Sequence, residues 1–278
     1  MTALQIGIMC GRLSPQIDNK IQIFPTTCWK NEFKVASSCG FDCIEWIFDL
    51  QKNPILDERG INEMKKLSIE SNVQINSLCC DYFMERPLFN VSEFDLNKRL
   101  EILQQLIVSC SKLGIKILEL PFVDIASLKT DNEENQVVKN LDKYISLAEK
   151  NNILVTFETD LKPRRFEQFL KKFNHKNIAA NYDTGNSASL DYDVSEEISI
   201  LGPCISNIHI KDRILHGKTV DLGKGNTNFD QFFSELQKIN YKGDLIIQGA
   251  RNDSNEKPEA TCKRYLEFVK QYVHKYSL

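Results

Sequence analysis

Short apolar runs alternate with longer amphipathic segments along the whole chain. Between the runs, apolar residues recur at three- and four-residue steps, as on one face of a helix, over 57–71, 94–113, 228–239 and 258–276. This alternation predicts strands separated by helices, the pattern of a parallel α/β fold. The eight predicted strands begin near Leu4, Asp42, Val73, Ile115, Ile153, Asn177, Cys204 and Asp244.

The connections differ in length at the two ends of the predicted strands. Each turn from helix to strand is short and begins at a residue that tolerates the left-handed conformation of a helix end. These residues are Gly40, Asn72, Gly114, Asn151 or Asn152, Asn174 and Asn240. The loops after the strands are longer, at 11–26, 81–93, 184–192 and 211–227. Long loops on one face only are typical of a barrel enzyme.

The number of units decides between two parallel architectures. A right-handed crossover allows either a doubly wound sheet or a closed barrel. The chain has eight strand–helix units and no glycine-rich phosphate loop after its first strand. We therefore expect a single eight-stranded parallel (β/α)8 TIM barrel, with residues 1–278 forming one domain.

The composition disfavours nucleic-acid-binding, disulfide-rich and membrane proteins. The chain has 278 residues, a net charge of -3 and a pI of about 5.9, which disfavours a dedicated nucleic-acid surface. Its nine cysteines form no CxxC pair, so we expect structural thiols rather than a zinc site or a disulfide framework. There is no signal-peptide pattern and no apolar stretch near 18 residues, so we expect a cytoplasmic protein with no membrane partner.

Four polar residues each close an apolar run in the second half of the chain: Glu158, Asp183, His209 and Gln248. Residues that end successive strands of a parallel barrel converge on the catalytic face. Two carboxylates, an imidazole and an amide oxygen can together hold a divalent ion such as manganese, magnesium, cobalt or zinc. Taken singly, Glu158 could instead form an ion pair, Asp183 a turn, and His209 a satisfied core contact.

Other strand ends supply candidates for substrate binding. These are Arg12, Glu45, Trp46, Asp81, Glu119 and Arg251. Arg251 could bind a phosphate or carboxylate with its guanidinium, or be an ordinary surface residue. The aromatic side chains of Trp46, Tyr82, Phe83 and Phe122 could form an apolar wall for a sugar ring, or pack in the core or rim.

Several spaced motifs resemble those of the xylose-isomerase-like barrel superfamily, and more narrowly its sugar phosphate isomerase/epimerase group. They are Phe157-Glu158, the stretch 182–186 (YDTGN), the stretch 209–212 (HIKD) and the Gly-x-Gly loop at 223–225. The resemblance covers essentially the whole chain. It implies a divalent metal held by Glu158, Asp183, His209 and a last-strand glutamate, with two glutamates exchanging a proton across an enediolate. Gln248 stands at the fourth position and departs from this pattern.

The resemblance implies a metal-dependent isomerase or epimerase of a sugar or sugar phosphate. Glu158 would be the base, and Lys211 or Arg251 would orient the substrate. Because an amide cannot carry a proton as a carboxylate does, Gln248 leaves alternatives open. These are a one-base aldose–ketose isomerase, a dehydratase or lyase acting on a polyol, and a sugar-binding barrel without turnover.

The expected partner is a small-molecule sugar, with homodimer formation a further expectation because related barrels often pair. Endonuclease IV has a related barrel, but its zinc cluster needs several histidines. This chain has four in all, and Asn186 stands where that enzyme would have one. We therefore expect no nucleic-acid partner.

Overall fold

Eight parallel strands close a barrel in the computed structural model, which describes residues 4–50, 52–251 and 256–278. The order round the barrel is β1, β2, β3, β4, β5, β6, β7 and β10, and β10 returns to β1. This confirms the predicted (β/α)8 architecture. The strands are β1 Ile6–Met9, β2 Cys43–Ile47, β3 Gln74–Cys79, β4 Ile117–Phe122, β5 Leu154–Thr159, β6 Ile178–Asp183, β7 Ile205–Ile210 and β10 Asp244–Ile247.

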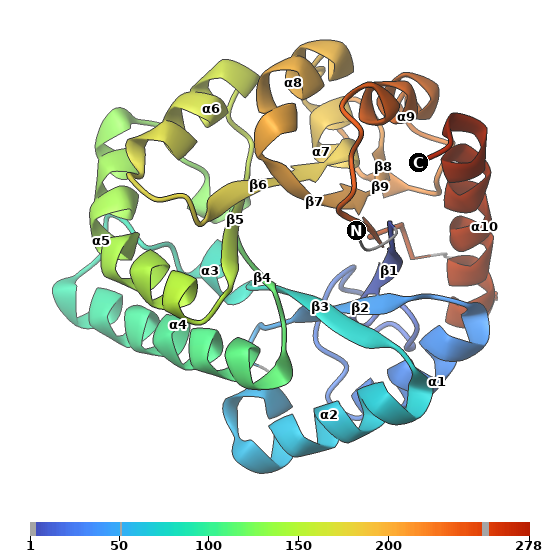
Figure 1. The fold of residues 1–278 in the computed structure, drawn as a ribbon, viewed down its shortest axis with the longest axis horizontal. Helices are drawn as coiled ribbons and strands as arrows, with labels where there is room; N and C mark the ends of the chain where they lie inside the picture. Colours follow the sequence, from blue (N-terminus) through green and yellow to red (C-terminus); the bar gives the residue numbers. More distant parts are fainter. Residues whose placement is uncertain (1–3, 51, 252–255) are drawn as a thin grey trace.

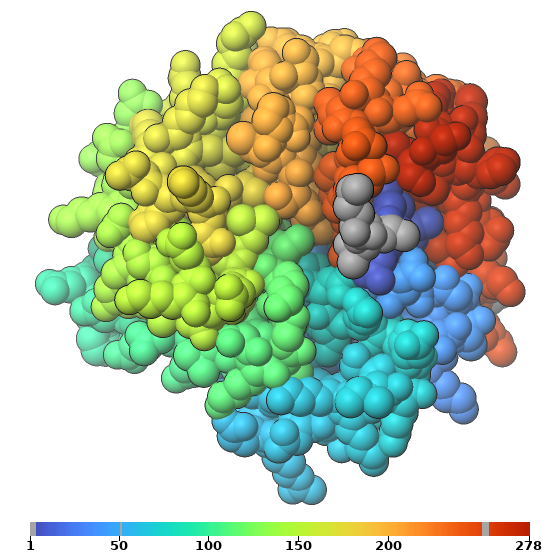
Figure 2. Space-filling view, in the orientation of Figure 1, coloured from blue at the N-terminus to red at the C-terminus, as the bar shows by residue number. Residues whose placement is uncertain are grey.

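Helices form a ring outside the strands (Figure 1). The main ones are α1 Trp29–Cys39, α2 Glu58–Ser71, α4 Glu93–Leu113, α5 Asp131–Lys150, α6 Pro163–Lys172, α8 Val194–Leu201, α9 Phe229–Lys238 and α10 Pro258–Tyr276. Successive segments lie side by side round the ring in chain order, and the C-terminal helix α10 lies beside the N-terminal segment (Figure 2). Both ends of the chain therefore take part in closing the barrel.

The strands present alternate side chains to two different surroundings. On β5, Phe157 points outward and its ring packs with Phe169 of α6, at a centroid distance of 5.5 Å. On β6, Tyr182 stacks on Phe232 of α9 at 5.6 Å. The residues on either side of these aromatic rings, such as Glu158, point into the barrel. The apolar outer layer thus fixes which polar side chains face the centre.

Most predicted helix ends are confirmed. Gly40, Asn72 and Gly114 cap α1, α2 and α4 in the left-handed conformation. The prediction for Asn174 is wrong, because α6 ends at Lys172 and the next residue, Phe173, is already extended. That extended residue brings the Phe173 ring into a stacked contact with Phe157 at 5.0 Å.

Three of the predicted loops contain short elements. The segment 81–93 includes helix α3, Tyr82–Glu85, and 184–192 includes helix α7, Thr184–Ser189. The segment 211–227 contains an antiparallel pair, β8 Asp212–Arg213 and β9 Thr219–Val220. The remaining elements are single 3-10 turns: η1 Pro54–Leu56, η2 Asp124–Ala126 and η3 Gly202–Cys204. Helices α3 and α7 and the β8–β9 pair each follow a barrel strand, so they lie on the face that carries the predicted site residues.

The nine cysteines all lie in the described part of the chain and carry free thiols. Burial raises the pKa of the Cys10, Cys43 and Cys80 thiols well above the usual value. Such thiols pack as small apolar groups. Among the described residues, no helix combines the length and apolar character needed to cross a bilayer.

Candidate metal centre and active site

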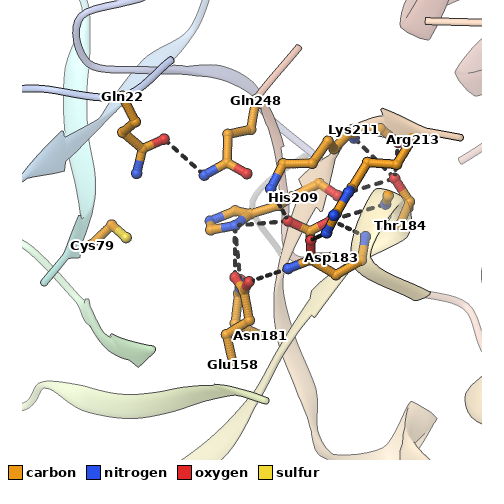
Figure 3. Close-up of polar contacts among 12 residues, drawn as sticks. Gln22, Cys79, Glu158, Asn181, Asp183, Thr184, His209, Lys211, Arg213 and Gln248 are labelled. Atoms are coloured by element: carbon orange, nitrogen blue, oxygen red, sulfur yellow. Dashed lines mark hydrogen bonds and ion pairs between the residues drawn. The ribbon is translucent and has the colours of Figure 1, made fainter. Parts of the chain in front are cut away.

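The strand register brings the four predicted ligands to one end of the barrel. Asp183 of β6 pairs with His209 of β7, and His209 pairs with Ile246 of β10. Gln248 follows β10 and donates its backbone N–H to the Ile210 carbonyl at 2.9 Å. Figure 3 shows the side chains of Glu158, Asp183, His209 and Gln248 gathered round one point.

One side of the His209 ring faces two carboxylates. Its Nδ1 lies 3.1 Å from Glu158 Oε2 and 3.9 Å from Asp183 Oδ2. One ligand atom from each of these three residues lies within 4.8 Å of the others, close enough to share a metal ion. All three residues are buried. A mixed oxygen and nitrogen set of this kind suits a borderline divalent ion.

Asp183 uses its two carboxylate oxygens differently. Oδ1 accepts the backbone N–H groups of Gly185 and Asn186 at 2.9 and 2.8 Å, and so caps helix α7. Oδ2 faces Lys211 Nζ at 2.7 Å. A Cβ on Gly185 would lie 2.7 Å from Lys211 Cγ, so glycine is needed for the lysine to pass. The turn and the ligand interpretations of Asp183 are therefore compatible, since they involve different oxygens.

Glu158 is held by two amides. Asn186 Nδ2 donates to Oε1 at 2.6 Å, and Asn181 Nδ2 donates to Oε2 at 2.9 Å. Burial alone would raise the pKa of Glu158, but hydrogen bonding and charge from His209, together with the charge of Lys211, lower it to about 2. The side chain is thus an oriented, ionised carboxylate at neutral pH.

The opposite side of the His209 ring faces a second, deeper pair of carboxylates. Nε2 lies 2.6 Å from Glu45 Oε1 and 3.2 Å from Glu119 Oε2, and both glutamates are fully buried. Burial alone would lower the pKa of His209, but the charges of Glu119 and Glu45 raise it well above the usual value. Ser77 Oγ and Asn207 Nδ2 donate to the other oxygen of Glu45 and fix its position.

Both carboxylate pairs could contribute to a metal site with His209. A neutral imidazole has one nitrogen lone pair, however, and its other nitrogen carries a proton. Metal-bound histidines commonly donate that proton to a buried carboxylate. The short contact to Glu45 fits this role, which leaves Nδ1 for an ion held by Glu158 and Asp183.

Gln248 offers an amide oxygen beside these three residues. Its Nε2 donates to Gln22 Oε1 at 3.0 Å. Its Oε1 is buried and has no hydrogen-bond partner within the described part of the chain. A buried oxygen left without a donor is costly unless something else satisfies it. The oxygen therefore fits a metal ligand, as the sequence predicts.

A cavity of about 380 Å³ opens above these residues. Of the residues predicted to act in the site, its lining includes Arg12, Asp81, Glu119, Glu158, Lys211 and Gln248. Arg12 is itself buried, and its guanidinium donates to the Gly249 and Ile21 carbonyls. Burial lowers the pKa of Arg12 to about 10. The volume suits a small polyhydroxylated molecule.

Three predicted substrate-binding residues do not line this cavity. Glu45 lies beneath His209, as described above. Trp46 is fully buried on the outer side of β2, with its ring 5.3 Å from that of Phe24, so it packs in the core instead of forming a wall for a sugar. Arg251 donates to the carbonyls of Gly11, Ser14 and Ile21, and so holds the loop after β1. We no longer expect these three to contact substrate.

The amides that orient the site are not among the residues predicted from the sequence. Asn181 and Asn207 stand two residues before Asp183 and His209, so strand alternation places each pair on the same face. That two-residue step is a signal that could have identified them. Gln22 and Asn186 lie outside the strands, and no periodic pattern indicates their roles.

Comparisons with known proteins agree with this geometry. Residues 33–272 match the family model described as xylose isomerase-like TIM barrel. An L-ribulose-5-phosphate 3-epimerase from Shigella flexneri serotype 5b is 23% identical over 261 residues, covering 89% of this chain and 91% of that protein.

Two solved structures share the fold over nearly the whole chain. One is a xylose isomerase domain protein from Planctomyces limnophilus, with a TM-score of 0.80, 14% identity and 99% of both chains covered. The other is an L-ribulose 3-epimerase, with a TM-score of 0.79, 18% identity, and 99% of this chain and 96% of the other covered. At these identities, the likeness concerns the fold.

Proposed function

The chain belongs to the xylose isomerase-like TIM barrel family, and we propose that it is a divalent-metal-dependent enzyme that isomerises or epimerises a sugar or sugar phosphate through an enediolate. The observation that carries this proposal is the convergence of Glu158, Asp183 and His209 within 4.8 Å beneath a cavity of about 380 Å³. The names of the relatives, which are sugar and sugar phosphate 3-epimerases, support the same reaction class.

Glu158, Asp183, His209 and Gln248 would hold the ion. When bound, the ion supplies positive charge beside the oxygen on which negative charge develops in an enediolate. Glu158 is ionised and lines the cavity, so it is the base that removes the carbon-bound proton. Asn186 and Asn181 fix the direction in which its oxygens point.

Lys211 is the best-placed residue to orient the substrate. Its ammonium lies 2.7 Å from Asp183 Oδ2, the residue lines the cavity, and 13% of its side chain is exposed. An ammonium has three donors, so it can bind a substrate oxygen while it still contacts Asp183. It would hold a hydroxyl or carbonyl oxygen of the sugar next to the base.

Gln248 bears on whether the reaction is a two-base epimerisation or a one-base isomerisation. Inversion by two opposed carboxylates needs a second base where this chain has an amide. We therefore favour proton transfer by Glu158 on a single face, which interconverts an aldose and a ketose. The amide also supports a second candidate, a sugar-binding barrel without turnover. The single-domain extent 1–278, the cytoplasmic location and homodimer formation stay predictions from the sequence.

Manganese(II) binding by metal-depleted protein, followed by the EPR signal of the free ion, tests the proposal. We expect one ion per chain and loss of that binding in His209→Ala. Aldoses and ketoses, including L-ribulose and its 5-phosphate, are then incubated with the loaded protein in deuterated water. Deuterium incorporation above background supports an enzyme. Metal binding without incorporation favours the binding barrel, and absence of metal binding overturns the metal-dependent mechanism.

A further inference from the structure

Gln22 links three polar residues above the metal centre. It lies in the loop between β1 and α1, and its Oε1 accepts hydrogen bonds from Gln248 Nε2 at 3.0 Å and from Arg12 Nη2 at 3.1 Å. Its Nε2 donates to Asp81 Oδ2 at 2.6 Å. Both ends of the Gln22 amide are therefore engaged, and each end has a different kind of partner.

The chemistry of the partners fixes which end of the Gln22 amide points where. A guanidinium can only donate, and an ionised carboxylate can only accept. Arg12 is itself immobilised by the Gly249 and Ile21 carbonyls. Burial raises the pKa of Asp81 to about 6, so above that pH the carboxylate is ionised. Gln22 must then turn its oxygen toward Arg12 and Gln248, and its nitrogen toward Asp81.

The orientation of the Gln22 amide in turn determines the orientation of the Gln248 amide. Facing an oxygen of Gln22, Gln248 can only present its own N–H group. Its Oε1 is then left on the other end of the amide, away from Gln22, as Figure 3 shows. That oxygen is buried and has no donor among the described residues. The loop after β1 thereby determines that an oxygen, not a nitrogen, faces the candidate metal centre.

We propose that Gln22 is a positioning residue that selects an amide, in preference to a carboxylate, as the fourth metal ligand. The inference rests on the proposed metal-dependent function and goes beyond it. A glutamate at position 248 would place a carboxylate oxygen next to Gln22 Oε1. Both oxygens are hydrogen-bond acceptors, so they would repel each other instead of forming a hydrogen bond. Gln248 is thus part of a matched polar network with Gln22, Asp81 and Arg12. The network explains why the site can keep its ion while it lacks a second base.

A double-mutant cycle tests this inference through metal affinity, without any measurement of activity. Manganese(II) dissociation constants are measured at about pH 8 for the unaltered protein, Gln22→Met, Gln248→Glu and the double variant. Gln22→Met should weaken binding roughly tenfold when Gln248 is present, the scale seen for loss of an orienting partner. In the Gln248→Glu background the same change should strengthen binding, because it removes the facing acceptor.

The reversal of sign is the decisive result. A role for Gln22 in loop stability alone would change the affinity in the same direction in both backgrounds, and that outcome would overturn the inference. Gln16→Met is the matched control. Gln16 lies in the same loop, and among the described residues its side chain makes an exposed hydrogen bond to the Lys20 carbonyl and none to the Gln22 network, so we expect unchanged affinity.

Two controls, thermal melting of each variant and manganese binding by the unaltered protein, distinguish misfolding and failure of the proposed function from failure of this inference. Circular dichroism melts show whether each variant folds, and Gln22→Leu replaces Gln22→Met if the latter does not. If the unaltered protein binds no manganese, the proposed function fails and this inference fails with it. If it binds manganese and Gln22→Met changes the affinity equally in both backgrounds, the proposed function stands and only the proposed role of Gln22 is overturned.

Discussion

Glu45 Oε1 lies 2.6 Å from Nε2 of His209, on the side of the ring opposite Glu158. An imidazole anchored in this way has a fixed orientation and an electron-rich second nitrogen, both of which favour metal binding at Nδ1. Glu45 therefore belongs to the candidate metal centre, although it lies beneath the cavity and does not line it.

Glu45→Gln should lower manganese(II) affinity by about 10- to 100-fold, the range for loss of such a carboxylate partner. The substitution keeps the size of the side chain and removes its charge. Calorimetric titration of metal-depleted protein measures the effect. Glu63→Gln, at a partly exposed carboxylate paired with Lys30, serves as the control and should leave the affinity unchanged. Equal affinities for Glu45→Gln and the unaltered protein would show that His209 needs no anchor.

Glu158→Gln should reduce deuterium exchange into a substrate by about 10²- to 10⁴-fold, the usual contribution of a general base. An amide oxygen can still bind an ion, so metal affinity should fall less than activity does. Both quantities are measured on the same preparation, exchange by NMR and affinity by titration. Full exchange activity in this variant would assign the base elsewhere.

Asp212 holds the loop that follows β8 and β9. It is fully buried and accepts the backbone N–H groups of Gly223, Gly225 and Thr227 at 2.9, 2.8 and 3.0 Å. A Cβ on Gly225 would lie 2.3 Å from Asp212 Oδ1, so the loop and the carboxylate fit closely. Asp212→Ala leaves these three backbone N–H groups without an acceptor. We therefore expect the free energy of unfolding to fall by about 2–4 kcal/mol. Urea denaturation measures it, and Asp212→Asn, which keeps the shape, should lose less.

Glu197 makes stability depend on pH. It is buried, accepts a hydrogen bond from the Tyr182 hydroxyl at 2.7 Å, and has a pKa raised by burial from 4.5 to about 7. Between these values the unfolded chain releases a proton that the folded chain keeps. This contribution to stability is therefore fully present below about pH 4.5 and is lost as the pH rises to about 7.

Glu197→Gln should remove that loss. Compared with the unaltered protein, the variant should gain up to about 3 kcal/mol in relative stability between pH 4.5 and pH 7. Urea unfolding at several pH values measures the difference. A difference that does not change across this interval would mean that Glu197 titrates normally in the fold.

The sequence predicted the elements well wherever packing is periodic. The sequence predicts the start of β5 near Ile153, and the strand begins at Leu154. The prediction succeeds because outward and inward side chains alternate regularly along this strand. The end of α6 was misplaced because the contact of Phe173 with Phe157, distant in sequence, overrides the local preference of Asn174 for a helix end. Helix α7 lies in the segment 184–192, which the sequence predicts as a loop, with a turn from Asp183 into a helix as the alternative; the helix is short and begins at the Asp183 cap.

The same division applies to the site. Glu158 and Asp183 end their strands or nearly do, and parallel register brings them to His209. Glu45 stands two residues before the end of β2, so it lies one layer deeper than a substrate contact. Gln22 could not be predicted, because the path of a loop depends on contacts that no repeating pattern records.

The hydrogen bond between Gln22 and Gln248 joins residues 226 positions apart. During synthesis, β10 must therefore leave the ribosome before the proposed fourth ligand, Gln248, meets the residue that orients it. A nascent chain that ends before β10 has neither this ligand nor the strand that seals β1 to β7. In the proposed enzyme, high-affinity binding of an ion would follow the synthesis of β10, and it would report that β10 and the loop after β1 have come together.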